Sequence, residues 1–487
     1  MLRHTVVLRY PGLKRPHTQR KLNLKMKNLL LLVMAAGAFT LTPDAARALN
    51  LTHLYAEAVV HDMRYAESGA SYREARTLIP VARSAFLPHV SANANTAYNI
   101  LQSTILGGTT GFTFPSGRFA FNSNGYGISV TETLLNVQAL YDYRAAGQSL
   151  KASRIRYRLS ASRLVLSVAQ RYFDLLLAKS ELRLRQAEEH ALRAQLARAK
   201  RSFRLGTATV IDAKDARARY EAVRAQALDA ANAVRITRSR IEQMTGARAR
   251  HVWPLALGKL PPPPSRGSVL LEESRASRHN LVLLATRAEA RAARARASAA
   301  AAGRYPTITA EAAYTYNRAG NSQFGFGSVI REKSIGLNLS LPIYQGGELS
   351  AASARAEARA YKAHVAVLRT ERAVEFDVRQ AFLNERNGYA EVRALRVAEK
   401  AAHVALQSDR LGLKVGVRND VEVLRAQQNY YQARRDFARA VFAYLLSRLS
   451  LKAAVSELTV GDIRQLNALL RPPSGSSPRS SHVGSRG

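Results

Sequence analysis

The chain has 487 residues and no cysteine, which excludes disulfides, thiolate metal sites and thiol nucleophiles. Its formal net charge is +38, a balance that suits nucleic acid, an anionic membrane surface or acidic cargo. The basic residues are spread along predicted helices, however, and no recognisable nucleic-acid motif accompanies them. We therefore expect no nucleic-acid partner.

The N-terminal segment has the order of a secretory signal. Residues 25–27 include two lysines, residues 29–41 are apolar, and Ala46-Arg47-Ala48 supplies the small residues of a cleavage site. The apolar run is shorter than the roughly 20 residues that a membrane-spanning helix needs. We interpret residues 1–48 as a signal region, with Met26 as an alternative start, and expect an exported protein without a membrane-spanning helix.

Four later segments alternate between apolar and polar side chains. They are residues 90–100, 126–134, 308–317 and 334–341. The second is the weakest, because Glu132 sits on its apolar face. Runs of about ten alternating residues match strands of a membrane barrel, although a soluble sheet with one solvated face alternates in the same way. Long polar loops, predicted at 101–125 and 318–333, favour the barrel.

Long helices follow the strands. Residues 140–204 contain no proline and a single glycine, Gly147, and residues 349–411 behave similarly. A helix of about 65 residues extends roughly 100 Å, far beyond an ordinary globular domain. Such rods must pack side by side as coiled coils. The fold class is therefore predicted to be mainly α with β.

The same order of elements occurs twice. Arg204-Leu205-Gly206-Thr207 corresponds to Lys414-Val415-Gly416-Val417, which lies 210 residues later. We expect two repeats, 49–250 and 269–470, joined by a linker at 251–268 whose four consecutive prolines cannot continue a helix. The tail 471–487, rich in Ser, Gly, Pro and Arg, is predicted to be disordered.

Four strands per chain cannot close a barrel, because eight is the usual minimum. Open strand edges are not tolerated in lipid, since their backbone groups would lack hydrogen-bond partners. The pattern therefore predicts a closed oligomer, and three copies would supply 12 strands. The strand pattern does not itself fix the number of copies.

The sequence resembles the TolC family of outer-membrane channels from about residue 49 to residue 470. The resemblance is strongest at 341–347 (Leu-Pro-Ile-Tyr-Gln-Gly-Gly), at 415–451, at 203–246, and near Asp462-Ile463. It implies a homotrimer with a 12-stranded barrel in the outer membrane above a helical tunnel in the periplasm. It also implies a passive duct for efflux or type I protein secretion, connected through a periplasmic adaptor protein to an inner-membrane pump or ABC exporter. Neither enzymatic activity nor a cofactor is implied.

The resemblance also assigns roles to the turns. Gly206 and Gly416 would end the two helical hairpins at the tunnel entrance, with the second hairpin mobile. Pro342, Gly346 and Gly347 would form a turn from strand to helix.

The resemblance also implies a periplasmic gate, and four charged residues of this chain fall at its positions. Arg418 matches the family's gate arginine, and Asp212 matches an acidic partner position on the first hairpin. Glu422 matches an acidic position that faces the axis. The chain departs from the family at Arg425, where the best-known members carry a second acidic residue, and this departure puts cation preference in doubt.

Other functions were weighed against the channel. The cluster at 188–190 (Glu-Glu-His) places its side chains on different helix faces, where they cannot converge on a metal. No catalytic motif is present in the sequence. A periplasmic coiled-coil scaffold without a channel, and a basic nucleic-acid-binding rod, are the alternatives; the signal region and the paired strands argue against both.

Overall fold

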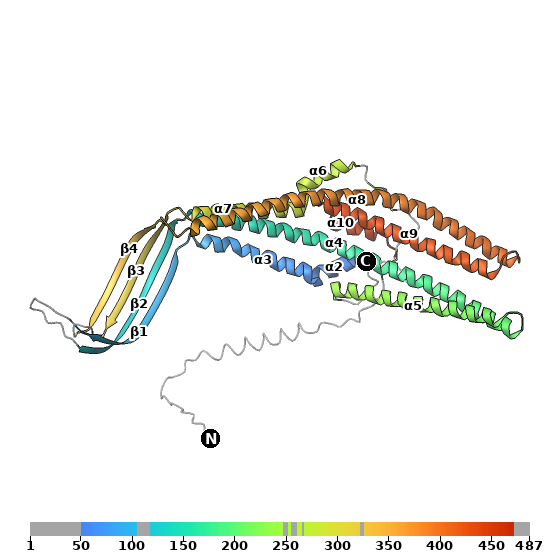
Figure 1. Ribbon diagram of the computed structural model, residues 1–487, viewed down its shortest axis with the longest axis horizontal. Coiled ribbons are helices and arrows are strands. Elements are labelled where there is room, and N and C mark those ends of the chain that lie inside the picture. Colours follow the sequence, from blue (N-terminus) through green and yellow to red (C-terminus); the bar gives the residue numbers. More distant parts are fainter. Residues whose placement is uncertain are drawn as a thin grey trace, which may run out of the picture. The chain divides into compact units, whose positions relative to one another are not determined.

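A computed structural model describes residues 50–104, 117–246, 252–254, 261–264, 267–321 and 326–471 (Figure 1). They belong to the unit Leu49–Gly487. The elements in chain order are α2 (Leu51–His61), α3 (Met63–Ser84), β1 (His89–Ser103), β2 (Gly117–Leu135), α4 (Val137–Arg204), α5 (Val210–Thr245), α6 (Val269–His279), α7 (Leu281–Ala302), β3 (Thr307–Ala319), β4 (Ser328–Ser340), α8 (Glu348–Lys414), α9 (Asp420–Ala454) and α10 (Val460–Asn467). The predicted signal region, and the tail beyond Arg471, lie outside the described residues.

The four strands form one antiparallel sheet in sequence order, with β1 and β4 at its edges. The pairing register brings the predicted apolar faces together: Tyr126 lies between Ala94 and Tyr316. The rings of Tyr126 and Tyr316 stack with 4.9 Å between their centroids. Farther along the same face, Ile335 pairs with Ala312. The alternation in the sequence therefore marks a single apolar face of one sheet.

The strands are longer, and the connections between them shorter, than the sequence predicted. β1 continues to Ser103 and β2 begins at Gly117, so the predicted loop at 101–125 is wrong at both ends. Likewise β3 continues to Ala319 and β4 begins at Ser328. The ladder continues because its bonds join backbone groups, which pair whether or not the side chains alternate in polarity.

The two longest helices confirm the predicted rods. α4 has 68 residues and α8 has 67, each equivalent to about 100 Å of helix. Asn136 begins α4 by accepting a hydrogen bond from the backbone N–H of Ala139 at 2.9 Å. No helix in the described ranges combines the length and the hydropathy needed to cross a membrane.

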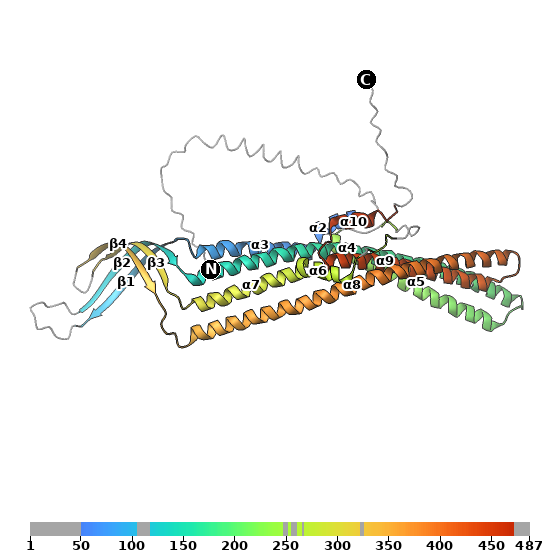
Figure 2. The same cartoon turned by 90° about the horizontal axis from the view of Figure 1, so that it is seen from above.

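Helices of the two repeats pack against each other. α4 contacts α5 of its own hairpin and also α7 and α9 of the second repeat, while α8 packs against α7 and α9 (Figure 2). The repeats therefore fold as one unit, Leu49–Gly487, and not as two domains. Away from the hairpin turns, the long helices of both repeats pack around one common core.

This core gathers the largest buried side chains. The rings of Phe173 on α4 and Phe442 on α9 stack with 5.0 Å between centroids, which joins the first repeat to the second. Around them lie buried residues from α2, α4, α5, α9 and α10, among them Leu51, Leu54, Val168, Tyr172, Ile241, Met244, Tyr444, Leu445 and Ile463. Burying a Leu, Ile or Phe side chain contributes about 1.5–3 kcal/mol. The cluster therefore stabilises both hairpins where they come together.

Two buried tyrosines hold the described parts of the linker against this core. The hydroxyl of Tyr172 donates a hydrogen bond to the carbonyl of Trp253 at 2.8 Å, and that of Tyr444 donates to the carbonyl of Pro262 at 2.6 Å. Both side chains are fully buried. Burial raises the pKa of Tyr172, and it raises the pKa of Tyr444 to about 12, so both hydroxyls stay protonated donors. The linker is thus fixed at two points.

We predict that Tyr172→Phe lowers the free energy of unfolding by about 1–3 kcal/mol, because the carbonyl of Trp253 loses the donor of a partly buried hydrogen bond. Trp253 is the single tryptophan, so its fluorescence during denaturant unfolding in detergent measures the change. Tyr361→Phe removes the same hydroxyl from a side chain that is 71% exposed and is the matched control. Equal stability of the two variants would contradict the anchoring role.

Candidate functional site

Both hairpin turns lie at the end of the helices opposite the sheet (Figure 1). Gly206 and Gly416 have φ angles of +73° and +79°, the left-handed conformation that glycine adopts without strain. The N–H of Thr207 bonds to the carbonyl of Ser202, and that of Val417 bonds to the carbonyl of Gly412, each at 2.9 Å. These are the bonds of the Schellman motif, which ends a helix sharply.

Each turn is followed by a capping box. Thr209 accepts a bond from the N–H of Asp212, whose carboxylate accepts the N–H of Thr209 at 2.9 Å. Asn419 and Glu422 make the same exchange, with both bonds at 3.0 Å. Hydrogen bonds from Thr209 lower the pKa of Asp212, and the N–H of Asn419 lowers the pKa of Glu422. The two predicted gate carboxylates therefore cap the first turns of α5 and α9.

Arg418 bridges the two helices of its own hairpin. Its guanidinium lies 3.5 Å from a carboxylate oxygen of Asp409 on α8 and 3.0 Å from Glu422 on α9. A bond from Arg418 also lowers the pKa of Glu422. The turn and the two carboxylates together give the guanidinium a fixed position across the end of the hairpin.

Gly412 leaves room for this arginine. It is buried, and a Cβ atom built on it would meet the Cγ of Arg418 at 2.6 Å. Sequence reasoning missed both Gly412 and Asp409, because neither lies in the repeated sequence motif at 414–417. In the sequence, Gly412 lies about one helical turn and Asp409 about two helical turns before Gly416. Such spacing is common in helices and singles out neither residue.

The structure does not bring Arg418 to Asp212. In the described chain Asp212 is bonded to Thr209, and Ala208 occupies the position in the first hairpin that corresponds to Arg418. A pair between Arg418 and Asp212 would compete with the capping box of α5. That pairing stays a prediction about contacts between hairpins.

Arg425 lies one helical turn beyond Glu422 on α9. Its side chain is exposed and makes no hydrogen bond or ion pair to any described residue. Its positive charge also lowers the pKa of Glu422. Arg425 thus stands beside the Arg418–Glu422 pair without being part of it.

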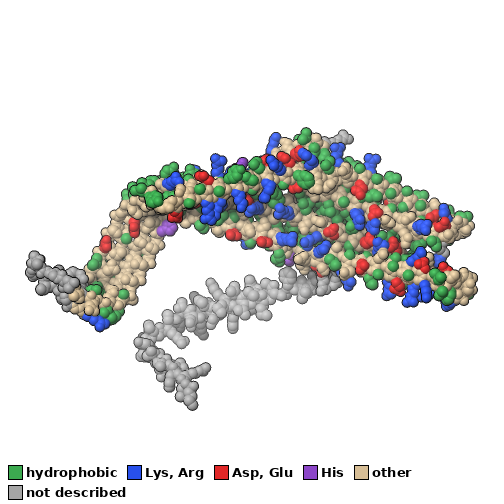
Figure 3. Space-filling model, viewed as in Figure 1, with side chains coloured by type: hydrophobic (Ala, Val, Ile, Leu, Met, Phe, Trp, Pro, Cys, Tyr) green, Lys and Arg blue, Asp and Glu red, His purple; other side chains and the backbone are tan. Residues whose placement is uncertain are grey.

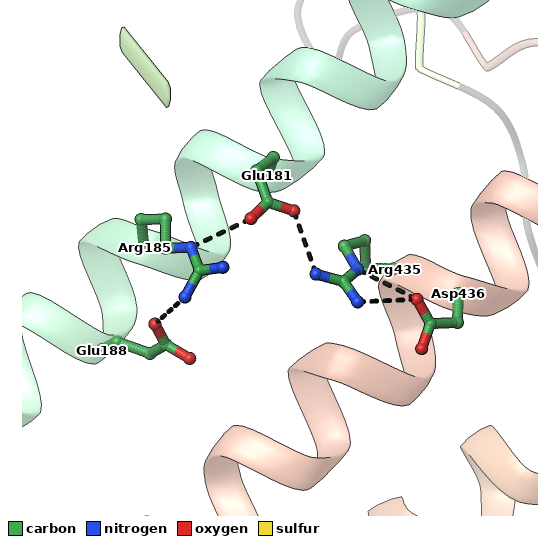
Figure 4. A network of polar contacts seen from close by, with 5 residues as sticks. All are labelled: Glu181, Arg185, Glu188, Arg435 and Asp436. Atoms are coloured by element: carbon green, nitrogen blue, oxygen red, sulfur yellow. Dashed lines mark hydrogen bonds and ion pairs between the residues drawn. The ribbon is translucent and has the colours of Figure 1, made fainter. Parts of the chain in front are cut away.

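A polar network joins the two hairpins farther from their turns (Figure 4). Arg435 on α9 lies 3.4 Å from Glu181 on α4 and 2.9 Å from Asp436. Arg185 bonds to Glu181 and to Glu188 at 2.9 Å each. Burial opposes the charge of Arg435, but its bonds to Asp436 and Glu181 raise its pKa above the ordinary value. The sequence gives no local signal for this contact.

The predicted turn from strand to helix is present between β4 and α8. Gly346 and Gly347 have φ angles of +58° and +88°, and Gly347 is the N-cap residue of α8. Ser350 donates to the carbonyl of Gly347 at 2.7 Å. Pro342 lies two residues beyond Ser340, the last residue of β4, where its missing N–H removes no ladder bond. The segment therefore turns the chain from the sheet into the third long helix of the sequence.

No group of three or more His, Cys, Asp or Glu residues in the described ranges could hold a metal ion. The charged side chains are instead distributed along the helices, and few lie on the sheet on the face that Figure 3 shows. At the second hairpin turn, the ion pairs of Arg418 can form or break, and exposed side chains such as Arg425 place positive charge at the surface.

Comparison with known proteins places the chain among channels. The family model described as outer membrane efflux protein matches residues 54–247 and 270–457. The chain is 29% identical over 451 residues to the outer membrane protein TolC of Vibrio cholerae, covering 92% of this chain and 99% of that protein. It is 25% identical over 439 residues to the proteases secretion protein PrtF of Dickeya chrysanthemi, covering 90% and 94%.

Among solved structures, the chain resembles the CmeC outer membrane channel of Campylobacter jejuni. The TM-score is 0.71 at 16% identity, with 87% of this chain and 90% of that chain covered. At this identity the likeness establishes the fold alone.

We predict that Gly412→Ala displaces Arg418, because the added methyl group would overlap the arginine side chain. Backbone amides at 412–422 should then exchange hydrogen faster, measured by hydrogen exchange and mass spectrometry in detergent. Gly147→Ala is the control, since a Cβ there meets nothing within 4 Å. Unchanged exchange at the turn in Gly412→Ala would show that Arg418 does not depend on this space.

The second capping box should weaken in acid. The folded-state pKa of Glu422 is depressed, so its stabilising effect is present above the unfolded value of about 4.3 and is lost as pH falls through the folded pKa. We expect protection factors at 415–422 to be constant from pH 7 to 5 and to fall in more acid solution. Glu422→Gln keeps a capping side chain and should abolish this pH dependence. A fall of the same size in the variant would exclude Glu422 as its source.

Proposed function

The chain belongs to the family of outer membrane efflux proteins, and on that premise we propose that it is an exit duct in the outer membrane for efflux or type I secretion. It would act as a passive conduit, opened at its periplasmic end when partner proteins bind. Both uses are named because the family is described by efflux and the relative PrtF by protease secretion.

The observation that carries this proposal is the exposed apolar face of a sheet with two unpaired edges. Ile335 is 92% exposed and Leu337 is 74% exposed, both on the edge strand β4, which pairs with β3 on one side only in the described sheet. An apolar face of this kind is stable against lipid, but only if every strand edge is paired. Three copies would bring β4 of one chain to β1 of the next and close 12 strands into a barrel.

The helices supply the rest of the duct. α4 and α8 each extend about 100 Å from the sheet side to the hairpin turns. Their solvent-exposed surfaces carry many charged residues, whereas few charged side chains lie on the face of the sheet that Figure 3 shows. Helices of this length, placed around a threefold axis by the barrel above them, would enclose a tunnel across the periplasm.

The hairpin turns would form its gate. Arg418 holds α8 to α9 through Asp409 and Glu422, and because the arginine is exposed and the carboxylates are partly exposed, solvent screens these pairs and they contribute little to stability. Weak pairs suit a closure that a partner must release. We propose that a periplasmic adaptor protein binds near these turns and that an inner-membrane pump or ABC exporter supplies the energy. Asp212 of another hairpin is the proposed alternative partner of Arg418.

The purified protein should form a trimer in detergent and conduct ions in planar bilayers. Arg418→Ser should increase the single-channel conductance several-fold, because the bridge between α8 and α9 is lost and the entrance can widen. Arg410→Ser is the matched control. Arg410 is exposed near the C-terminal end of α8, close to the turn that holds Arg418, and its side chain makes no hydrogen bond or ion pair to the described residues.

Two results would contradict the proposal in different ways. If the wild-type protein and both variants fold and oligomerise but none of them conducts ions, the duct is excluded and a coiled-coil scaffold is favoured. Conductance that is equal in Arg418→Ser and Arg410→Ser would keep the duct and exclude Arg418 from its gate.

A further inference from the structure

The two hairpin ends carry an excess of positive charge. We define the entrance tips as residues 197–218 and 407–428, which cover the same positions around Gly206 and Gly416. Together they contain ten basic and five acidic residues. All ten basic side chains are exposed. The excess does not depend on any single arginine, and each copy of the chain adds the same amount.

Four acidic side chains of the entrance tips are already engaged. Asp212 is bonded to Thr209 in its capping box, and Asp215 pairs with Arg219 at 2.9 Å. Asp409 and Glu422 share Arg418 and are only partly exposed. A carboxylate that is bonded to a backbone N–H or to a guanidinium attracts a mobile cation less strongly. These four groups therefore contribute little free negative charge.

Most of the basic side chains, in contrast, are unengaged. Eight of the ten make no hydrogen bond or ion pair to a described residue: Lys200, Arg201, Arg204, Lys214, Arg217, Arg410, Lys414 and Arg425. Arg425 is the clearest case, because the neighbouring carboxylate of Glu422 is bonded to Asn419 and Arg418 instead. The free charge at the entrance tips is thus positive on both hairpins.

From this charge distribution we infer that the entrance of the duct prefers anions, and that it favours anionic solutes over cationic ones among the molecules delivered to it. The inference rests on the proposed function, because only an assembled duct places three sets of entrance tips around one opening. Like charges that line a narrow opening with low-dielectric walls focus the field and concentrate counter-ions. At physiological salt a charge acts over a Debye length of about 8 Å, so side chains that line the opening would act on the ions that enter it.

The test is the reversal potential of the purified wild-type channel in a planar bilayer, with a tenfold gradient of KCl kept at low ionic strength. We expect chloride to be more permeant than potassium. Arg425→Glu should reduce the ratio of chloride to potassium permeability several-fold, and Arg425→Glu combined with Arg204→Glu should reduce it further. Arg464→Glu makes the same charge change on α10, away from the entrance tips, and should leave the ratio unchanged.

The outcomes separate the inference from the proposed function. Absence of conductance in the folded wild-type oligomer would overturn both. A conducting wild-type channel that prefers potassium would overturn the anion preference and leave the duct intact. Equal changes of the permeability ratio in Arg425→Glu and Arg464→Glu would also overturn it, because the selectivity would then not arise at the tips. Circular dichroism and trimer formation of each variant show that the comparison is made between folded proteins.

Discussion

The need to pair every backbone N–H and C=O group of the sheet governs the rest of this molecule. Within one chain β2 and β3 are paired on both sides, whereas β1 and β4 each keep an unpaired edge. The sheet also exposes large apolar side chains such as Ile335 and Leu337. In lipid an apolar face is favourable, but an open edge is not. The fold of a single chain is therefore incomplete. In the proposed trimer, the threefold symmetry that closes the sheet also arranges the helices around the same axis.

The two hairpins share one backbone design and differ in side chains. Both turns use a Schellman motif followed by a capping box, so the turn itself is equally fixed in each. Only the second hairpin has an arginine in its turn, Arg418, which pairs with both α8 and α9; the first hairpin has Ala208 at this position. Any difference in mobility between the hairpins must then come from contacts between helices. The Arg435–Glu181 contact between α9 and α4 is one such place.

Capping also determines which charges at the hairpin ends are free. Asp212 and Glu422 are needed to begin α5 and α9, and their hydrogen bonds with backbone N–H groups lower their pKa values. The same bonds reduce their pull on ions in solution. The exposed arginines and lysines around them do not cap a helix, so most of their charges stay free to act on ions in solution. A structural requirement of the turns thus leaves a positive balance at this end of the molecule.

The sequence alone determined the features that depend on neighbouring residues. Alternation with a period of two marked the strands and their common face, the lack of proline marked the long helices, and glycine marked the turns at 206 and 416. Strand ends were misplaced at Ser103 and Gly117 because backbone pairing continues without alternation in the side chains. Only the tertiary structure showed that Arg418 pairs with Asp409 above Gly412, that Arg435 reaches Glu181, and that Tyr172 and Tyr444 hold the linker. These contacts depend on which faces of distant helices meet, and no local period in the sequence records that choice.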